Sequence, residues 1–157
     1  MSGDDTRGPS PRPTQIPDDV IRDRAIMIAP QNRKLGIDVL ELTHREALFR
    51  LPYRDDLAGN AETGVLHGGV ITTLLDAASG GAVFCALSKL VPVATLDLRI
   101  DYLKPAIPGN DLFALARCYK TTRHIAFVRA WAYHQTRDDA IATASSVFML
   151  SSSPKQI

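Results

Sequence analysis

The chain has 157 residues, 45% of them hydrophobic and 22% charged, a composition typical of one soluble domain with a sizeable core. Its net charge of +1 gives no electrostatic basis for binding nucleic acid or a membrane surface, and we expect neither as a partner. The sequence has no unbroken apolar run of roughly 18 to 20 residues, as a transmembrane helix needs, and no secretory signal pattern, so we expect a cytoplasmic protein.

The first 17 residues hold four prolines among Gly, Ser and Asp, a composition typical of a disordered tail over residues 1–17. The remaining residues, 18–152, are predicted to form a single domain. Apolar residues spaced between charges predict a short helix over residues 18–29, with Asp18 as its cap and Pro30 as its end.

Two strands are predicted next, over residues 36–42 and 46–53, joined as a hairpin. After the loop at 54–66, small and apolar residues dominate the segment 68–89. A helix that is apolar on nearly every side packs in the middle of a protein, so this segment is predicted to be a long central helix.

Beyond Pro92 apolar and polar residues alternate, which predicts half-buried strands. In the first of these strands, one set of side chains is expected to point to the same face of the sheet: Ala94, Leu96, Leu98, Ile100 and Tyr102. Three more alternating segments follow, near residues 111–120, 123–134 and 139–150. Consecutive strands without intervening helices exclude βαβ crossovers, so the fold class is α+β, with one antiparallel sheet curled around one helix.

The two cysteines, Cys85 and Cys118, are distant in sequence and form no Cys-x-x-Cys or Cys/His motif. Cysteines in this pattern indicate reduced core thiols, as in a cytosolic protein, rather than a disulfide or a zinc site. No metal site is therefore expected.

Asp76 is the single charge within the predicted central helix. An unpaired buried carboxylate is costly, and a structural Asp caps a helix more readily than it occupies the middle of one. Its neighbours at three- and four-residue spacing are small or polar: Thr72, Thr73, Ser79 and Gly80. A carboxylate on such a stripe can act as a general base or as a nucleophile, and both roles remain open.

The sequence His67-Gly68-Gly69 stands where the helix begins. A helix N-terminus presents unpaired N–H groups and a partial positive charge, which can hold an oxyanion or a polarised carbonyl. Glycines allow a substrate to approach this backbone, and His67 can polarise a carbonyl or orient the loop. The alternative is a tight loop-to-helix joint with a structural histidine.

Gly68 and Asp76 are separated by about eight residues of helix, which at 1.5 Å per residue is roughly 12 Å. Within one chain they cannot touch the same reacting atom. If both serve one reaction, His67 and Gly68 of one subunit must face the partner subunit's Asp76, which predicts at least a dimer.

Three features combine into a fairly specific pattern: Gly64-x-x-His67-Gly68-Gly69, Asp76 nine residues after the histidine, and Tyr102-Leu103-Lys104-Pro105-Ala106. Over about residues 35–150 the chain resembles hotdog-fold acyl-CoA thioesterases of the phenylacetate-degradation (PaaI-like) type. The resemblance implies a hotdog fold, homodimers and usually tetramers. It also implies hydrolysis of an acyl-CoA to a free acid and coenzyme A, with no metal and no cofactor besides the coenzyme A of the substrate.

The resemblance also implies a role for each motif residue. Asp76 corresponds to the base or nucleophile, the Gly68 N–H holds the thioester oxygen, and His67 orients the loop and the substrate. Gly69 belongs to the substrate-binding backbone. Thr95 matches a position where relatives carry a Ser or Thr that steadies the attacking water.

The chain departs from the family pattern at two places. Relatives often carry a loop Asn six residues before the histidine, whereas here Asn60 lies seven before it and Ala61 occupies the expected position. Asn60 is retained as a substrate-binding candidate through a longer loop. Relatives often have Gly-Arg where this chain has Thr122-Arg123. Arg123 and Lys104 are candidates for binding coenzyme A phosphates, and the alternative for each is a solvated surface charge.

Two other functions compete with hydrolysis. A hotdog enoyl-CoA hydratase would carry an Asp followed five residues later by a His, and no Asp in this sequence has that spacing. A non-catalytic acyl-CoA-binding domain would gain nothing from a carboxylate at position 76. The acyl group stays undetermined, because Phe84, Leu87, Val91 and the loop 54–62 could line an aromatic or an aliphatic pocket.

Overall fold

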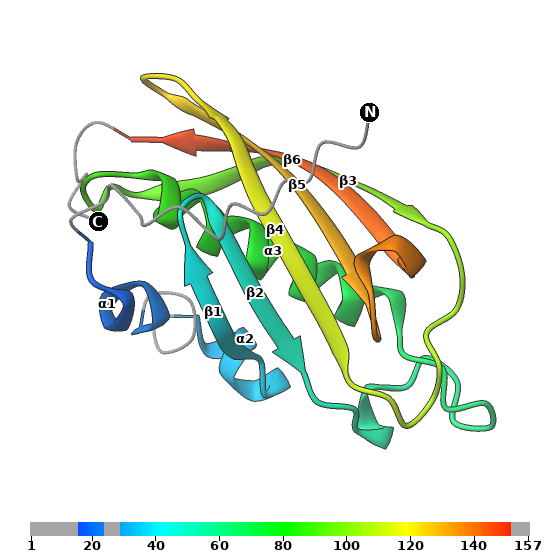
Figure 1. Cartoon of the computed structure of the whole chain (residues 1–157). Coiled ribbons are helices and arrows are strands. Elements are labelled where there is room, and N and C mark those ends of the chain that lie inside the picture. The colour runs from blue at the N-terminus through cyan, green and yellow to red at the C-terminus, as the bar shows by residue number, and fades with distance from the viewer. Residues whose placement is uncertain (1–15, 24–28, 152–157) are drawn as a thin grey trace, which may run out of the picture.

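The structure is a computed structural model that describes residues 16–23 and 29–151. Two short helices come first, a strand hairpin and one long helix follow, and four further strands complete the fold (Figure 1). The elements are α1 (Asp18–Arg22), α2 (Pro30–Leu35), β1 (Asp38–Thr43), β2 (Glu46–Leu51), η2 (Asp55–Leu57), α3 (Gly68–Ala86), β3 (Val93–Tyr102), β4 (Leu112–Thr121), β5 (Ile125–Tyr133), η3 (Arg137–Asp139) and β6 (Ala142–Leu150).

The strands form one six-stranded antiparallel sheet in the order β1-β2-β4-β5-β6-β3. This sheet curves around α3, which lies against its concave face (Figure 1). The architecture confirms the predicted α+β class with one long central helix. Strands β1 and β3 are the two edges of the sheet among the described residues.

Helix α3 forms the centre of the core. Its inward side chains are fully buried: Leu74, Leu75, Ala78, Ala82 and Val83. Gly81 allows β2 to approach closely, since a Cβ at this position would lie 2.9 Å from Cζ of Phe49. By length and composition α3 could also cross a membrane, with a mean hydropathy of 1.5, but half of that stretch is buried inside the fold. It packs here as a core helix.

The prediction near the N-terminus was wrong at Pro30. Pro30 was expected to end a helix, whereas it begins α2, where the first turn tolerates a residue without an N–H. Residues 24–28 of the predicted helix and residues 1–15 of the predicted tail lie outside the described residues. Ile16 is buried and belongs to the hydrophobic core.

The predicted hairpin is confirmed, with β1 and β2 joined by a turn at His44 and Arg45. Arg45 adopts the left-handed backbone conformation, with φ 63°. Its guanidinium donates to Cys118 O over 3.1 Å and to Thr121 Oγ1 over 3.2 Å. These bonds fix the turn against the end of β4.

Strand β3 departs from the predicted alternation. Its register with β6 shifts between Thr95 and Asp97, as at a β-bulge. Beyond the bulge, Leu98 and Ile100 pack against the core. Leu96 is 55% exposed, so the expectation that it shares one buried face with its neighbours was wrong. β3 is an edge strand that leaves apolar side chains uncovered within the chain.

Candidate active site

The start of α3 carries backbone donors in defined positions. The Gly69 N–H donates to Nδ1 of His67 over 2.9 Å, and the Val70 N–H donates to His67 O over 2.9 Å. For the N–H of Gly68, the first helical residue, no acceptor is found within the described part of the chain. The Gly68 N–H is therefore the donor at this helix start that is available to a ligand.

His67 is the N-cap of α3, with extended backbone angles of φ −62° and ψ 134°. Because its Nδ1 accepts the Gly69 N–H, the ring proton stands on Nε2. His67 is exposed, so the Nε2–H can donate to a group beside the helix start. In this tautomer the ring is a hydrogen-bond donor and has no free nitrogen with which to act as a base.

The glycine at position 69 is explained by this cap. A Cβ on Gly69 would lie 3.0 Å from Nδ1 of His67 and 3.2 Å from Cε1, which would crowd the ring. The Gly69 N–H already donates to His67, so it is not free to bind a substrate oxygen. A substrate-binding role for Gly69 stays a prediction, and it would rest on close contact of the substrate with the glycine backbone.

A pocket of about 320 Å³ adjoins Gly68. Most of its lining is apolar and comes from the loop before α3, from the first turn of α3, and from the end of β3 with the segment that follows it: Val65, Leu66, Ile71, Tyr102, Leu103, Lys104, Pro105 and Ala106. A Cβ on Gly68 would lie 3.3 Å from Oη of Tyr102, a tight contact that the Tyr102 side chain would have to relieve by a small shift. The pocket therefore places an apolar wall beside Gly68, the residue whose N–H is available to a ligand.

Asp76 lies further along α3 and is half-buried. The hydroxyl of Thr95, on β3, donates to Oδ1 of Asp76 over 2.8 Å. This bond leaves Oδ2 to accept a proton, and it leaves the lone pairs of the Thr95 oxygen free to accept a hydrogen from water. The structure thus brings together two of the predicted site residues, Asp76 and Thr95, within one chain.

Asn60 organises the loop before α3. Its Oδ1 accepts the Glu62 N–H over 2.8 Å and the Thr63 N–H over 3.4 Å, and its carbonyl accepts the Gly64 N–H over 2.9 Å. Tyr53 Oη also donates to Gly64 O over 2.9 Å. Asn60 therefore shapes the loop that leads to His67, and direct substrate binding by its amide stays a prediction.

Lys104 and Arg123 lie at different places. Lys104 lines the pocket beside Gly68 and forms an ion pair with Asp139. Arg123 follows β4 and lies with Lys89 in a pocket of about 360 Å³, near the other end of α3. Leu87 and Val91, predicted to line an acyl pocket, belong to this second pocket. Within one chain, then, only Lys104 of the two cations lies near the start of α3.

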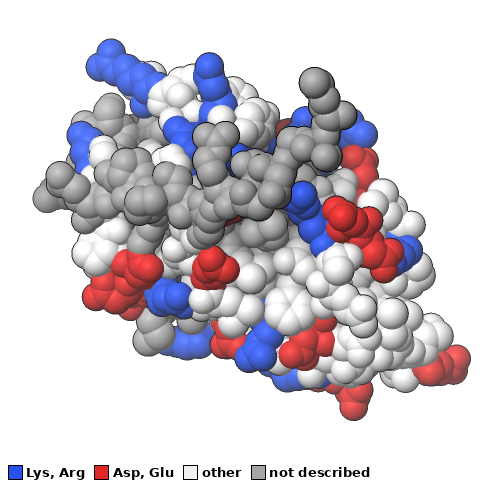
Figure 2. All heavy atoms as spheres, in the orientation of Figure 1, with Lys and Arg blue, Asp and Glu red and all other residues white. Residues whose placement is uncertain are grey.

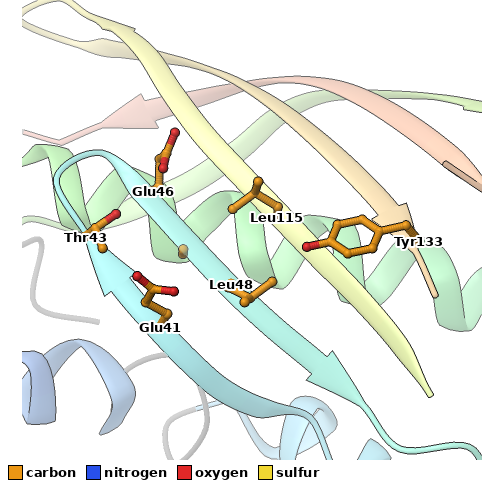
Figure 3. A pocket seen from close by; sticks show the side chains of 7 residues that line it. Glu41, Thr43, Glu46, Leu48, Leu115 and Tyr133 are labelled. Carbon is orange, nitrogen blue, oxygen red and sulfur yellow. The ribbon is translucent and has the colours of Figure 1, made fainter. Parts of the chain in front are cut away.

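Another hollow, of about 450 Å³, lies on the outer face of the sheet (Figure 3). It is lined by Glu41, Thr43, Glu46, Ala47, Leu48, Leu115 and Tyr133, and it contains none of the predicted site residues. Burial raises the pKa of the Tyr133 phenol, and the charge of Arg137 acts in the opposite direction. Figure 2 shows acidic and basic side chains interspersed over one face of the molecule, which offers no field of a single sign.

Two residues at the helix start were not among the predicted site residues. Tyr102 donates to Gly68 O over 2.8 Å, and Thr72 donates to the same oxygen over 3.1 Å. Tyr102 ends β3 and begins the motif Tyr102-Leu103-Lys104-Pro105-Ala106, which is visible in the sequence, but nothing in the sequence indicated a contact with Gly68. Thr72 lies one turn before Asp76 on the polar stripe.

Residues 63–141 match the model of the thioesterase superfamily. A putative esterase of Halobacterium salinarum is 43% identical over 83 residues, which is 51% of this chain and 54% of that protein, so this chain spans about half of that relative's length. The medium/long-chain acyl-CoA thioesterase YigI of Salmonella typhimurium is 29% identical over 138 residues, or 77% of this chain and 85% of YigI.

Solved structures share the fold. A Pseudomonas aeruginosa protein is 37% identical, with a TM-score of 0.74 over 82% of this chain and 98% of that one. A mutant of the phenylacetic acid degradation protein PaaI from Thermus thermophilus is 26% identical, with a TM-score of 0.67 over 76% and 97% of the two chains. These similarities confirm the predicted hotdog fold and the resemblance to the PaaI-like type. The chain therefore belongs to the thioesterase superfamily, a family of thioester hydrolases.

Proposed function

We propose that this protein hydrolyses acyl-CoA thioesters to a free acid and coenzyme A. The observation that carries the proposal is the pairing, on one helix, of a free Gly68 N–H beside the His67 ring with an Asp76 carboxylate bound by Thr95. A thioester needs a donor for its carbonyl oxygen and a base or nucleophile for its carbonyl carbon. The start of α3 supplies the donor, and Asp76, further along the same helix, supplies the base or nucleophile.

In the proposed reaction the thioester oxygen accepts hydrogen bonds from the Gly68 N–H and from the His67 Nε2–H. Asp76 takes a proton from water as the water oxygen attacks the carbonyl carbon. Alternatively its carboxylate attacks that carbon directly and forms an anhydride, which water hydrolyses after coenzyme A has left. Thr95 holds Oδ1 of Asp76, which orients the other oxygen. Negative charge on the former carbonyl oxygen is stabilised by the two donors until the C–S bond breaks. Coenzyme A leaves as a thiolate that is then protonated.

Each site is proposed to be shared between two subunits. Gly68 and Asp76 are roughly 12 Å apart on one helix, which is too far to serve a single carbonyl group. Strand β3 offers an open sheet edge with exposed apolar residues, including Leu96, next to the half-buried side of α3 that carries Asp76. Two chains paired along such edges would bring His67 and Gly68 of one toward the partner subunit's Asp76.

The residues that line the two pockets suggest which part of the substrate each pocket would hold. The apolar pocket beside Gly68 suits an apolar arm of the substrate, with Lys104 at its rim as a partner for an anionic group. Arg123 and Lys89 form a second cationic position for a coenzyme A phosphate. YigI is named for medium- and long-chain substrates, so acyl-CoAs of increasing chain length and phenylacetyl-CoA together form an informative panel.

The experiment is steady-state release of free thiol from this panel by the purified chain, compared with Asp76→Asn. Hydrolysis by the wild type and its loss in the variant is the expected result. Tight binding of acyl-CoA without thiol release would overturn the proposal in favour of a binding domain. Formation of a hydroxyacyl-CoA from an enoyl-CoA would overturn it in favour of a hydratase.

A further inference from the structure

The carbonyl oxygen of Gly68 is held by two side-chain hydroxyls. Oη of Tyr102 lies 2.8 Å from it and Oγ1 of Thr72 lies 3.1 Å from it, and the two hydroxyl oxygens are 2.8 Å apart, so the two hydroxyl protons are shared among these three contacts. Tyr102 is the last residue of β3, and Thr72 lies one turn inside α3. The edge strand is therefore tied by a hydrogen-bonded cluster to the first peptide group of the helix.

That peptide group leads directly to His67. The C=O of Gly68 and the N–H of Gly69 belong to the same planar amide, and this N–H donates to Nδ1 of His67 over 2.9 Å. A continuous chain of hydrogen bonds thus runs from the hydroxyl of Tyr102 through the amide to the imidazole. Hydrogen bonds in such a chain polarise one another. Donation to the carbonyl strengthens the amide N–H as a donor, and this in turn strengthens the Nε2–H of His67.

The cluster also restrains a helix start that is otherwise loosely defined. Two consecutive glycines have more backbone freedom than any other pair, and helix ends fray. The Tyr102 ring stands over Gly68, with Oη 3.3 Å and Cζ 3.6 Å from where a Cβ would be. Tyr102 therefore restricts the Gly68 peptide by contact as well as by hydrogen bonding. The direction of the Gly68 N–H depends on that restriction.

We propose that Tyr102, with Thr72, is a positioning residue that fixes and polarises the donor pair formed by the Gly68 N–H and the His67 Nε2–H. This inference rests on the proposed thioester hydrolysis, in which these two donors hold the substrate oxygen. Tyr102 itself acts through the peptide of Gly68 and touches no reacting atom. Its hydroxyl should affect the transition state, in which negative charge develops on that oxygen, more than the ground state.

The test uses Tyr102→Phe, which removes the hydroxyl and keeps the ring over Gly68. We expect kcat to fall about three- to tenfold with KM unchanged, a smaller loss than removal of a direct donor. Thr72→Val should lower kcat likewise, and Thr72→Ser should restore it. Because both hydroxyls act on one carbonyl, the double variant should lose less than the product of the two single losses. The matched control is Tyr119→Phe, since Tyr119 is 54% exposed on β4, and it should leave kcat unchanged.

A spectroscopic readout separates this inference from the proposed function. In ¹H–¹⁵N spectra, Tyr102→Phe should move the Gly69 amide proton to higher field and shift the His67 ring nitrogens, while Tyr119→Phe should move neither. These shifts are expected even if the wild type hydrolyses no acyl-CoA. A lack of hydrolysis would refute the proposed function but not the positioning role of Tyr102. A Tyr102→Phe variant with wild-type kcat and unmoved Gly69 and His67 resonances would overturn the positioning role. So would a rise in KM alone, which would make Tyr102 a binding residue.

Discussion

The Thr95 hydroxyl donates to Oδ1 of Asp76 over 2.8 Å, and this bond joins the edge strand β3 to the middle of α3 within a single chain. Tyr102 joins the same strand to the start of the helix through Gly68 O. β3 therefore contacts α3 at both halves of the proposed site, the carboxylate and the backbone donor. A shift of β3 along the sheet edge would disturb the two halves together, so we expect the proposed activity to depend on the register of β3 on β6.

The proposed hydrolysis should depend on the carboxylate of Asp76. Asp76→Ala and Asp76→Asn should both abolish hydrolysis while the fold survives, because neither side chain can act as a base or a nucleophile. Asp138→Asn is a matched control on the exposed η3 turn and should retain full activity. Turnover is measured with the best acyl-CoA of the panel. Retention of more than about a tenth of wild-type turnover, equivalent to about 1.4 kcal/mol of barrier, would refute the assignment.

Thr95 should affect the chemical step rather than binding. Thr95→Ala removes the donor to Oδ1 of Asp76, so the carboxylate loses its orientation and kcat should fall with little change in KM. Thr95→Ser keeps the hydroxyl and should stay within a few-fold of the wild type. The two variants are compared by full kcat and KM determination. An increase in KM alone for Thr95→Ala would assign the residue to the binding surface instead.

The fold could be predicted well where one physical effect dominates. Segment 68–89 is apolar on nearly every side, and only burial explains such a helix, so α3 was predicted to within a few residues of its observed bounds. Pro30 was misjudged because proline is compatible with both the end and the first turn of a helix. The exposure of Leu96 was missed because alternation reveals neither a bulge nor the position of a strand at the sheet edge.

The site could be predicted in part. Local spacing in the sequence singles out Asp76 and the His67-Gly68-Gly69 motif, whereas most of the detailed roles are what the resemblance to the PaaI-like type implies. The bond between Tyr102 and Gly68 joins residues 34 positions apart, and it depends on the sheet order that puts β3 beside α3. Such contacts follow from topology and register, which periodicity does not specify. The placement of Arg123 and Lys104 in different pockets likewise depends on topology and could not be read from the sequence.

His67 has an observed role as the N-cap of α3 and a proposed role as a donor to the thioester oxygen, and substitution can separate the two. His67→Ala should lower kcat by about ten- to a thousandfold, as for a single oxyanion donor. It should also lower the free energy of unfolding by about 1 kcal/mol, because the N-cap of α3 is lost. His67→Asn restores a capping oxygen but not the Nε2–H donor. We expect it to regain the stability without the activity, as measured by urea unfolding beside kinetics. Recovery of both in His67→Asn would reduce His67 to a structural cap.

Two adjacent glycines of α3 should respond oppositely to alanine. A Cβ at Gly81 would lie 2.9 Å from Cζ of Phe49 and 3.2 Å from Cβ of Ala47, so Gly81→Ala should destabilise the chain by about 1–3 kcal/mol. A Cβ at Gly80 would meet only Cε1 of Phe148, at 4.0 Å, among the described residues. Gly80→Ala should therefore keep or raise the stability, by up to about 1 kcal/mol from helix propensity. Unfolding midpoints of the two variants test this, and equal losses would contradict the packing of α3 on β2.

The last prediction concerns a site shared by two subunits. Gly68→Pro removes the free N–H at the first helical position, which tolerates proline, whereas Gly68→Ala adds a similar Cβ beside Tyr102 and keeps the N–H. Gly68→Pro should therefore be inactive, and Gly68→Ala should retain more activity. The comparison separates the loss of the donor from crowding against the Tyr102 ring.

Mixing inactive Gly68→Pro with inactive Asp76→Ala by co-refolding should restore hydrolysis. A statistical mixture contains about half heterodimers, and in each of these one of the two sites has both an intact Gly68 and an intact Asp76. Recovery should therefore approach about one quarter of the wild-type rate. Heterodimer formation is verified with differently tagged chains. A verified heterodimer that stays inactive would exclude the shared site, because Asp76 would then have to act within its own chain, roughly 12 Å from its Gly68.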